Sequence, residues 1–272
     1  MDELKVKKDF TDIYTQDSPY EYLKEMDRLE YTIPDSTKSL YVPLIEKLEE
    51  ALSRPINVLD LGSSYGINSS LMKYNLTMLE LNNFFLTGSE PTKKETKQFY
   101  EKCNSNGNMN FYQIDISKEA LKFSEEMNLC ERGMNVDLES EKLNLLESLP
   151  KMDIVIATGC IGYIGYKAFS NLLKVIKNRQ SNSIESETEY IAPIFAFSVL
   201  RMFDMDDIEE VFEIYDYSIV KSDIKPIRQR NFSDPKEKAQ TVSLLHDMGI
   251  NTEKHEDGGN FYADFYIAKS KN

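Results

Sequence analysis

The residues best placed to do chemistry are the acid and the glycines of the segment Val58-Leu59-Asp60-Leu61-Gly62-Ser63-Ser64-Tyr65-Gly66. An apolar run over residues 56–61 predicts a short strand, the glycines predict a turn, and a helical pattern follows. Glycines let a ligand approach the backbone closely, and a helix N-terminus presents free N–H groups. This arrangement suits a nucleotide-like ligand, bound through a pyrophosphate or through the carboxylate of an amino-acid moiety.

The glycine spacing separates these two ligand classes. The dinucleotide pattern requires three glycines, as Gly-x-Gly-x-x-Gly, and an acid about 20 residues later. Gly62 and Gly66 have a different spacing, and Tyr65 would crowd a pyrophosphate. The segment instead resembles motif I of class I S-adenosylmethionine-dependent methyltransferases, acid-x-Gly-x-Gly-x-Gly, with Ser64 replacing the middle glycine. Asp60 has a second interpretation, because Asp commonly caps backbone N–H groups of turns.

Three later segments resemble the same family, in the same order along the chain. Asp115 matches the acid that ends the second strand and binds the ribose of the cofactor, and Asp137 matches the third-strand acid at the adenine. Residues 153–159 resemble the fourth strand, which leads into the active-site floor. The resemblance therefore implies S-adenosyl-L-methionine as cofactor. The cofactor-binding residues that it implies are Asp60, Gly62, Ser64, Tyr65, Gly66, Asn68, Asp115, Ile116, Asp137, Leu138, Thr158 and Gly159.

The distance between Asp60 and Asp115 departs from the family pattern. The two acids lie 55 residues apart, which is much longer than the usual gap. An insertion over about residues 76–110 accounts for it, since this stretch contains a charged helical segment followed by turn formers. In another register the ribose acid would be Glu80. Because Glu80 follows a helical pattern and not a strand, Asp115 is the expected ribose ligand.

Strand and helix patterns alternate along the chain and predict its fold class. Strands are expected at residues 56–61, 111–116, 132–136, 152–158, 190–200, 224–232 and 261–268, and helices at 36–52, 117–128, 166–177, 205–215 and 235–248. The polar residues 178–189 have no periodicity and are predicted to form a mobile loop. The alternation predicts an α/β fold, a Rossmann-like doubly wound sheet of about seven mostly parallel strands.

The first 54 residues are expected to form an N-terminal helical lid, followed by the cofactor-binding domain over residues 55–272. The lid would consist of short helices on either side of a break at Ile33-Pro34-Asp35. Its tyrosines either pack in an ordinary core or line the acceptor site. Tyr31 is the candidate for contact with the methyl acceptor, because the stretch Tyr31-Thr32-Ile33-Pro34 is similar to one in a subgroup of bacterial stand-alone methyltransferases.

Five further residues are candidates for catalysis or for acceptor binding. Tyr163, in a glycine-rich segment after the fourth strand, and His255, in a polar turn, could act as a general base for an oxygen or nitrogen acceptor. The glycine-rich segment could equally be an ordinary strand-to-helix loop. Arg201, Arg228 and Arg230 are either surface charges or ligands of an anionic acceptor, since Arg binds carboxylate or phosphate bidentately.

The composition of the chain limits the classes of ligand and partner that it can bind. With 46 acidic and 32 basic side chains the chain carries a net charge of −14, which disfavours nucleic acid and favours a small-molecule acceptor, as in small-molecule metabolism. The longest apolar stretch is too short to cross a membrane. The N-terminus has no signal-peptide pattern, which favours the cytoplasm. The three cysteines are widely spaced and no His lies near them, so we expect neither a disulfide framework nor a bound metal.

Three alternatives to small-molecule methyl transfer remain. A nicotinamide-dependent (NAD) oxidoreductase would use the same topology, although the glycine spacing disfavours it. A protein that binds the cofactor without catalysis, as a scaffold or sensor, is also compatible with the residues. Methylation of a protein or an RNA would require a basic patch, for which Lys221, Lys225, Arg228 and Arg230 are the candidates.

Overall fold

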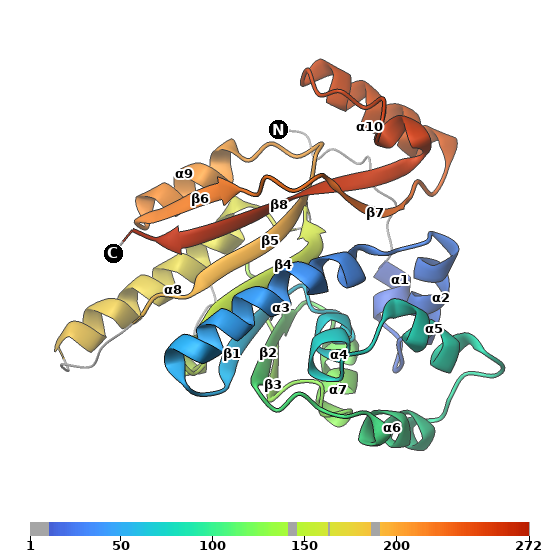
Figure 1. The fold of residues 1–272 in the computed structure, drawn as a ribbon, viewed down its shortest axis with the longest axis horizontal. Helices are drawn as coiled ribbons and strands as arrows, with labels where there is room; N and C mark the ends of the chain where they lie inside the picture. The colour runs from blue at the N-terminus through green and yellow to red at the C-terminus, as the bar shows by residue number, and fades with distance from the viewer. Residues whose placement is uncertain (1–10, 141–145, 163, 186–190, 272) are drawn as a thin grey trace.

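The computed structural model describes residues 11–140, 146–162, 164–185 and 191–271 and contains one eight-stranded sheet (Figure 1). The sheet has the order β3-β2-β1-β4-β5-β8-β6, with β7 also paired to β8. Strands β1 to β5 are mutually parallel, and β8 runs antiparallel to β5. The strands are β1 (Ile56–Leu61), β2 (Met109–Asp115), β3 (Arg132–Asn135), β4 (Ile154–Ile161), β5 (Ile194–Leu200), β6 (Tyr217–Lys221), β7 (Ile227–Asn231) and β8 (Asn260–Ser270).

The order 3-2-1-4-5 is that of the Rossmann fold, which confirms the predicted doubly wound α/β class. The sixth position is taken by the antiparallel β8. Strands β6 and β7 pair with opposite ends of β8, on the same side of that strand. The sheet is therefore seven strands wide, as the sequence predicted. The sequence analysis missed β6 because this strand is short and lies at the edge, with only Tyr217 fully buried.

Helices cover both faces of the sheet because side chains of its central strands alternate between two cores. Leu59 and Leu61 of β1 face α8 (Tyr166–Glu185) and α9 (Asp206–Ile214). Ile56 and Val58 face α3 (Ile33–Leu52) instead. A strand buried on both faces is typical of a parallel sheet. The remaining helices are α1 (Thr11–Tyr14), α2 (Tyr20–Arg28), α4 (Ile67–Lys73), α5 (Met78–Leu86), α6 (Lys93–Lys102), α7 (Lys118–Glu126) and α10 (Pro235–Asp247), with short 3-10 turns η1 (Leu146–Ser148) and η2 (Glu256–Gly258).

The N-terminal segment divides into two parts. Helix α3 begins at Ile33 with Pro34 in its first turn, where the missing N–H of proline costs nothing, and packs on the sheet. Helix α2 packs instead against α5, through a separate core that includes Leu23 and Leu81 (Figure 1). The described residues before α3, 11–32, are called the lid segment below, and their action as a lid stays a prediction.

Helix α8 corrects the sequence prediction for residues 178–189. The helix continues to Glu185, so residues 178–185 are helical and do not form the predicted loop; residues 186–189 lie outside the described part. Arg179 in this extension donates to the carbonyls of Leu146, Glu147 and Leu149, at 2.6–2.8 Å, and to that of Pro150. These contacts tie the polar end of α8 to the turn η1, which hydropathy patterns do not reveal.

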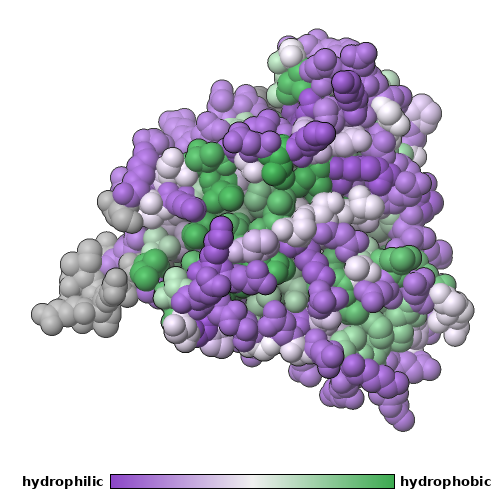
Figure 2. Space-filling model, viewed as in Figure 1, coloured by the Kyte–Doolittle hydropathy of each residue, from purple (hydrophilic) through white to green (hydrophobic). Residues whose placement is uncertain are grey.

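The surface reflects the acidic, polar composition. The face shown in Figure 2 is mostly hydrophilic at its rim, and apolar side chains gather over the part of the sheet that contains β8 and β6. Val220 of β6 is among the exposed apolar side chains. Within the described residues, no helix combines the length and apolar character needed to span a membrane.

Candidate functional site

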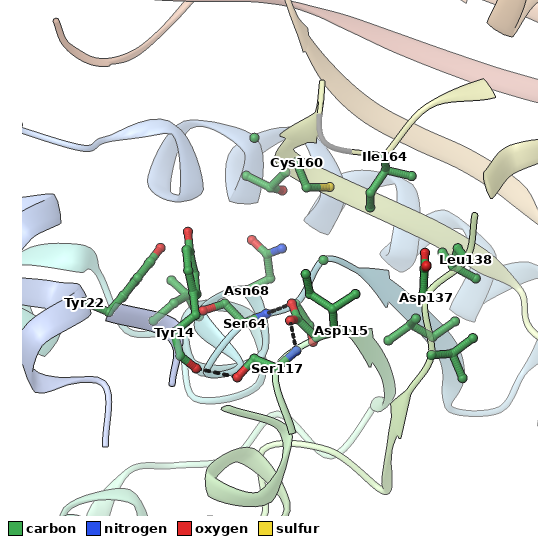
Figure 3. Close-up of a pocket in the computed structure, with 18 of the residues that line it drawn as sticks. Tyr14, Tyr22, Ser64, Asn68, Asp115, Ser117, Asp137, Leu138, Cys160 and Ile164 are labelled. Carbon is green, nitrogen blue, oxygen red and sulfur yellow. Dashed lines mark hydrogen bonds between the residues drawn. The ribbon is translucent and has the colours of Figure 1, made fainter. Parts of the chain in front are cut away.

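A cavity of about 510 Å³ opens at the carboxyl ends of β1, β2 and β4 (Figure 3). The strand order reverses between β1 and β4, and ligands of open α/β sheets bind at such a switch point. The volume is in the range of small-molecule sites. The described lining residues are Tyr14, Thr15, Tyr22, Tyr31, Pro34, Gly62, Ser63, Ser64, Ile67, Asn68, Ile114, Asp115, Ile116, Ser117, Val136, Asp137, Leu138, Glu139, Thr158, Gly159, Cys160 and Ile164.

The turn after β1 takes the same backbone conformation at three alternate positions. Gly62, Ser64 and Gly66 have φ angles of 62°, 50° and 72°, in the left-handed region. Glycine adopts this region freely, whereas other residues pay for it. Ser64 therefore takes a backbone conformation that glycine adopts more readily, as expected if it occupies the place of a glycine.

Gly62 and Gly66 have different surroundings. A Cβ on Gly62 would lie 2.7 Å from Cβ of Cys160, so glycine lets the turn approach the end of β4 beside the cavity. A Cβ on Gly66 would lie 2.5 Å from Oγ of Ser124, on α7 and away from the cavity. Gly66 therefore serves helix packing, and a direct cofactor contact for it has no geometric support.

Asp115 is held in position by the backbone of two turns. One of its carboxylate oxygens accepts from the N–H of Ser64 and the other from the N–H of Ser117, each at 2.8 Å (Figure 3). Burial raises the pKa of the carboxyl, and the two N–H groups oppose this shift. The alternative acid, Glu80, instead caps α5 in a capping box with Thr77. The structure thus supports the register that places Asp115, and not Glu80, at the cavity.

Asp60 lies beneath the cavity and is not exposed to it. It is fully buried, and Oδ1 accepts from the side-chain amide of Asn68 at 3.0 Å. Its Oδ2 has no hydrogen-bond partner in the structure. Burial raises the pKa of Asp60 to about 7. Asn68, which does line the cavity, therefore connects Asp60 to the site.

The two ends of the cavity are lined by different types of side chain. Leu138 lies beside Asp137 at one end, and the lining also includes the apolar side chains of Ile114, Ile116, Val136 and Ile164 (Figure 3). Tyr14 and Tyr22 stand at the other end, with ring centroids 5.5 Å apart (Figure 3). Burial and the neighbouring tyrosines raise the pKa of Tyr22, so its hydroxyl stays protonated at neutral pH.

Tyr65 anchors the segment that carries these tyrosines. Its hydroxyl lies 3.0 Å from the carbonyl of Ile13 and 2.9 Å from that of Gln16, and it accepts from the N–H of Gln16. The side chain is fully buried and does not line the cavity. The cofactor contact expected for Tyr65 is therefore replaced by a role in docking the lid segment, to which Ser117 also donates at the carbonyl of Tyr14.

The structure brings together ten of the residues chosen from the sequence. These lining residues are Gly62, Ser64, Asn68, Asp115, Ile116, Asp137, Leu138, Thr158 and Gly159 for the cofactor, and Tyr31 for the acceptor. The sequence analysis did not select Tyr14, Tyr22 or Cys160. Tyrosine spacing in the N-terminal segment was the available signal for the first two, whereas Cys160 had none.

The three candidate arginines do not line the cavity. Arg201 pairs with Glu256 at 2.9 Å, Arg228 with Glu30 at 2.7 Å, and Arg230 with Glu237 at 2.8 Å. A role in binding an anionic acceptor therefore has no support from the geometry. Because Lys221 also pairs, with Asp264, carboxylates neutralise three of the four cations of the expected basic patch.

The two candidate bases have different outcomes. His255 is not among the cavity residues, and its ring packs edge-on against Tyr262. Burial and the neighbouring Arg201 lower the pKa of His255. Its proposed role as base is therefore not supported by position. Tyr163 lies outside the described residues.

The charged residues that line the cavity are all acidic. Asp115, Asp137 and Glu139 contribute carboxyl groups, and none of the described lining residues is Lys, Arg or His. Such a lining favours a ligand that is neutral or positively charged over an anionic one.

Comparisons with known proteins give distant structural likenesses only. No protein-family model and no curated protein matches the chain. Among solved structures, it is similar to magnesium protoporphyrin IX methyltransferase from Synechocystis PCC 6803 with bound SAM (TM-score 0.44, 12% identity, covering 95% of this chain and 88% of that one). It is also similar to a TehB-like SAM-dependent methyltransferase from Corynebacterium glutamicum (TM-score 0.38, 11% identity, 87% and 100% covered). Likenesses at these scores do not identify a function, which has to be argued from the cavity residues.

Proposed function

We propose that the chain is a class I methyltransferase that binds S-adenosylmethionine in the cavity and transfers its methyl group to an oxygen or nitrogen atom of a small molecule. The observation that carries the proposal is the pairing of a left-handed motif I turn with Asp115, whose carboxylate is bound by the N–H of Ser64 in that turn. The cytoplasm is the compartment that we propose from the sequence.

The residues present fit this cofactor. Asp115 offers a carboxylate to two vicinal ribose hydroxyls, a strong type of hydrogen bond. The apolar side chains of the lining, with Leu138 beside Asp137, suit an adenine ring. Ser63 and Ser64 also line the cavity, so the turn itself contributes polar residues to the site.

Charge discriminates between this cofactor and a dinucleotide. S-adenosylmethionine carries a sulfonium and an ammonium group, and the cavity offers it three carboxyl side chains. A pyrophosphate would meet these carboxyl groups without a lysine or arginine among the described lining residues. The lining therefore favours the methyl donor over NAD.

The chain's own contribution to the reaction would be positioning and exclusion of water. When bound, the cofactor supplies an electrophilic methyl group on its sulfonium. The tyrosines of the lid segment close one end of the cavity, and holding an acceptor in line with the methyl group supplies much of the rate. An anionic acceptor is not favoured, because the arginines that could bind it are paired elsewhere. Tyr163 stays the candidate base for an acceptor that must lose a proton.

Calorimetric titration with S-adenosylmethionine and S-adenosylhomocysteine tests the proposal. Asp115→Asn keeps the shape of the side chain but removes its charge, and we expect affinity to fall roughly a hundredfold, about 3 kcal/mol, as two hydrogen bonds to a charged group are weakened. The control is Glu80→Gln, which changes the acid excluded from the site and should leave affinity within about twofold.

The outcomes separate the alternatives. Failure of both compounds to bind the wild-type protein would remove the methyltransferase proposal. An equal loss of affinity in both variants would remove Asp115 from its role. Tight binding without methyl transfer to any acceptor of a broad panel would favour the non-catalytic binding protein.

A further inference from the structure

Three tyrosines form the end of the cavity that lies opposite Asp137, called the tyrosine end below. Tyr14, Tyr22 and Tyr31 are all lining residues, and the rings of Tyr14 and Tyr22 stand with their centroids 5.5 Å apart (Figure 3). Tyr31 joins them through a side-chain hydrogen bond with Tyr22. The face of an aromatic ring is electron-rich and attracts a cation that lies within about 6 Å of its centroid. Rings grouped in this way are suited to a positively charged group.

A carboxylate lies next to these tyrosines. The N–H of Ser117 donates to Asp115 at 2.8 Å, and the hydroxyl of Ser117 donates to the carbonyl of Tyr14, so one residue links the acid to the tyrosine end (Figure 3). Burial is the main cause of the raised pKa of Tyr22, and the negative charge of Asp115 contributes to it. Hydrogen bonds from ribose hydroxyls would leave this charge in place. The charge of Asp115 therefore stabilises a cation at the tyrosine end and opposes an anion there.

Asn68 brings a further oxygen atom to the cavity. The residue lines the cavity and is 8% exposed, and its Nδ2 donates to Asp60 at 3.0 Å. Its Oδ1 has no hydrogen-bond partner among the described residues, and it is not one of the unpartnered atoms that are fully enclosed. Figure 3 shows this oxygen on the side of the tyrosines. Because an amide oxygen accepts hydrogen bonds and cannot donate them, Asn68 offers a partner to an ammonium group and none to a carboxylate.

The arginine that contacts the chain beside Tyr31 is already neutralised. The guanidinium group of Arg228 pairs with the carboxylate of Glu30 at 2.7 Å, and Arg228 does not line the cavity. None of the described lining residues is Lys, Arg or His. A carboxylate or phosphate group that entered the tyrosine end would therefore meet Asp115 without a compensating positive charge, which is unfavourable in a partly buried site.

We propose that the tyrosine end is the acceptor subsite and that it binds an ammonium group, so that the methyl acceptor is a cationic, amine-bearing small molecule. The tyrosine rings would face the ammonium group, and Oδ1 of Asn68 would accept one of its N–H bonds. Asp115 supplies the opposite charge, which also offsets the repulsion between the acceptor and the positive sulfonium of the cofactor. This inference rests on the proposed function and names the substrate class.

The test compares three probes with the same aromatic ring on the full chain saturated with S-adenosylhomocysteine. Benzylamine is cationic at neutral pH, benzyl alcohol is neutral and of nearly the same shape, and benzoate is anionic. S-adenosylhomocysteine occupies the cofactor end and has no sulfonium, so the probes report on the rest of the cavity. We expect ligand-detected NMR titration to rank benzylamine at least about tenfold above benzyl alcohol, with benzoate weakest, since the cation gains contacts with the rings and one hydrogen bond from a charged group.

Tyr14→Leu removes one ring of the tyrosine end, whereas the bond from Ser117 is to the backbone of residue 14 and can persist. We expect the affinity for benzylamine to fall about fivefold and that for benzyl alcohol less than about twofold. Tyr14→Phe retains the ring and should keep most of the preference for the cation. The ratio of the two affinities in one sample does not depend on the fraction of folded protein, so partial unfolding of a variant cannot imitate this result.

Tyr74→Leu is the matched control. Tyr74 is also half-buried and pairs with a second tyrosine, Tyr100, at a centroid distance of 5.3 Å, but it does not line the cavity. Its substitution should leave the preference for benzylamine unchanged. If Tyr14→Leu does not fold at all, Tyr31→Leu removes a different ring of the tyrosine end and should lower the preference in the same direction.

Five results would overturn the inference. These are benzylamine binding no tighter than benzyl alcohol or benzoate, no detectable benzylamine binding at millimolar concentration, displacement of S-adenosylhomocysteine by benzylamine, an unchanged preference in Tyr14→Leu, and equal losses of preference in Tyr14→Leu and Tyr74→Leu. The titration with S-adenosylhomocysteine alone is a separate measurement. Its failure would remove the proposed function itself, whereas normal binding there with one of the five results removes only the cationic acceptor subsite.

Discussion

The two ends of the cavity are built in different ways. The end proposed for the cofactor consists of strand ends and one turn, with Asp115 bound to the backbone of that turn. The tyrosine end joins Tyr31 to Gln229, which are 198 positions apart in the sequence and meet over Gly159. Local backbone conformation thus determines the first end, and long-range packing determines the second. Substitutions at the tyrosine end should therefore leave the structure of the cofactor end unchanged.

The largest effect is expected for the buried acid beneath the cofactor end. Asp60 has a folded-state pKa of about 7, raised by burial, whereas an unfolded Asp ionises near pH 4, about 3 units lower. Between these values the folded state holds more protons than the unfolded state, so ionisation of Asp60 lowers stability as the pH rises. Asp60→Asn cannot ionise, so it avoids this loss of stability, which reaches about 4 kcal/mol above pH 7.

Urea unfolding of both proteins between pH 4 and pH 8 measures this effect. The free energy of unfolding of Asp60→Asn minus that of the wild type should increase from about pH 4 to about pH 7 and then level off. The other titrating groups contribute equally to both proteins, so their contributions cancel in this difference. A constant difference across this window would show that folding does not raise the pKa of Asp60 and that burial of this acid at the cofactor end carries no such cost.

The same contrast explains what the sequence could predict. The turn, Asp115 and the central parallel strands follow from local patterns, and the left-handed φ of Ser64 shows that a motif survives the loss of a glycine. The tyrosine end was predicted less well. The sequence pointed to Arg228 and Arg230, but both pair with carboxylates, and the bulge between them places an extra residue, Gln229, close to Gly159. Strand alternation alone cannot locate one extra residue in a ladder.

A smaller effect is expected where the lid segment meets the cofactor end. Tyr65→Phe removes the hydroxyl that bonds to Ile13 and Gln16. Losing about 1 kcal/mol of hydrogen bonding should make amide hydrogen exchange over residues 12–17 roughly fivefold faster. The control is Tyr100→Phe, which removes a buried hydroxyl bonded to Ser70. Equal exchange over residues 12–17 in the two variants would mean that Tyr65 does not dock the lid.

The smallest effect tests whether the backbone of the turn is strained at Ser64. Ser64→Gly relieves a left-handed conformation worth about 1–2 kcal/mol, and the greater freedom of glycine in the unfolded chain costs about 0.5–1 kcal/mol. The two terms nearly cancel, so stability should change by less than about 1 kcal/mol.

Ser63→Gly is the matched control for this turn. Ser63 is also buried, with an unpartnered hydroxyl, but it does not have a positive φ. It offers no strain to relieve, so glycine there should cost about 1 kcal/mol more than glycine at position 64, as measured by thermal unfolding. Equal destabilisation of both variants would show that Ser64 tolerates its conformation without strain. Local backbone conformation would then not be what distinguishes the cofactor end from the tyrosine end.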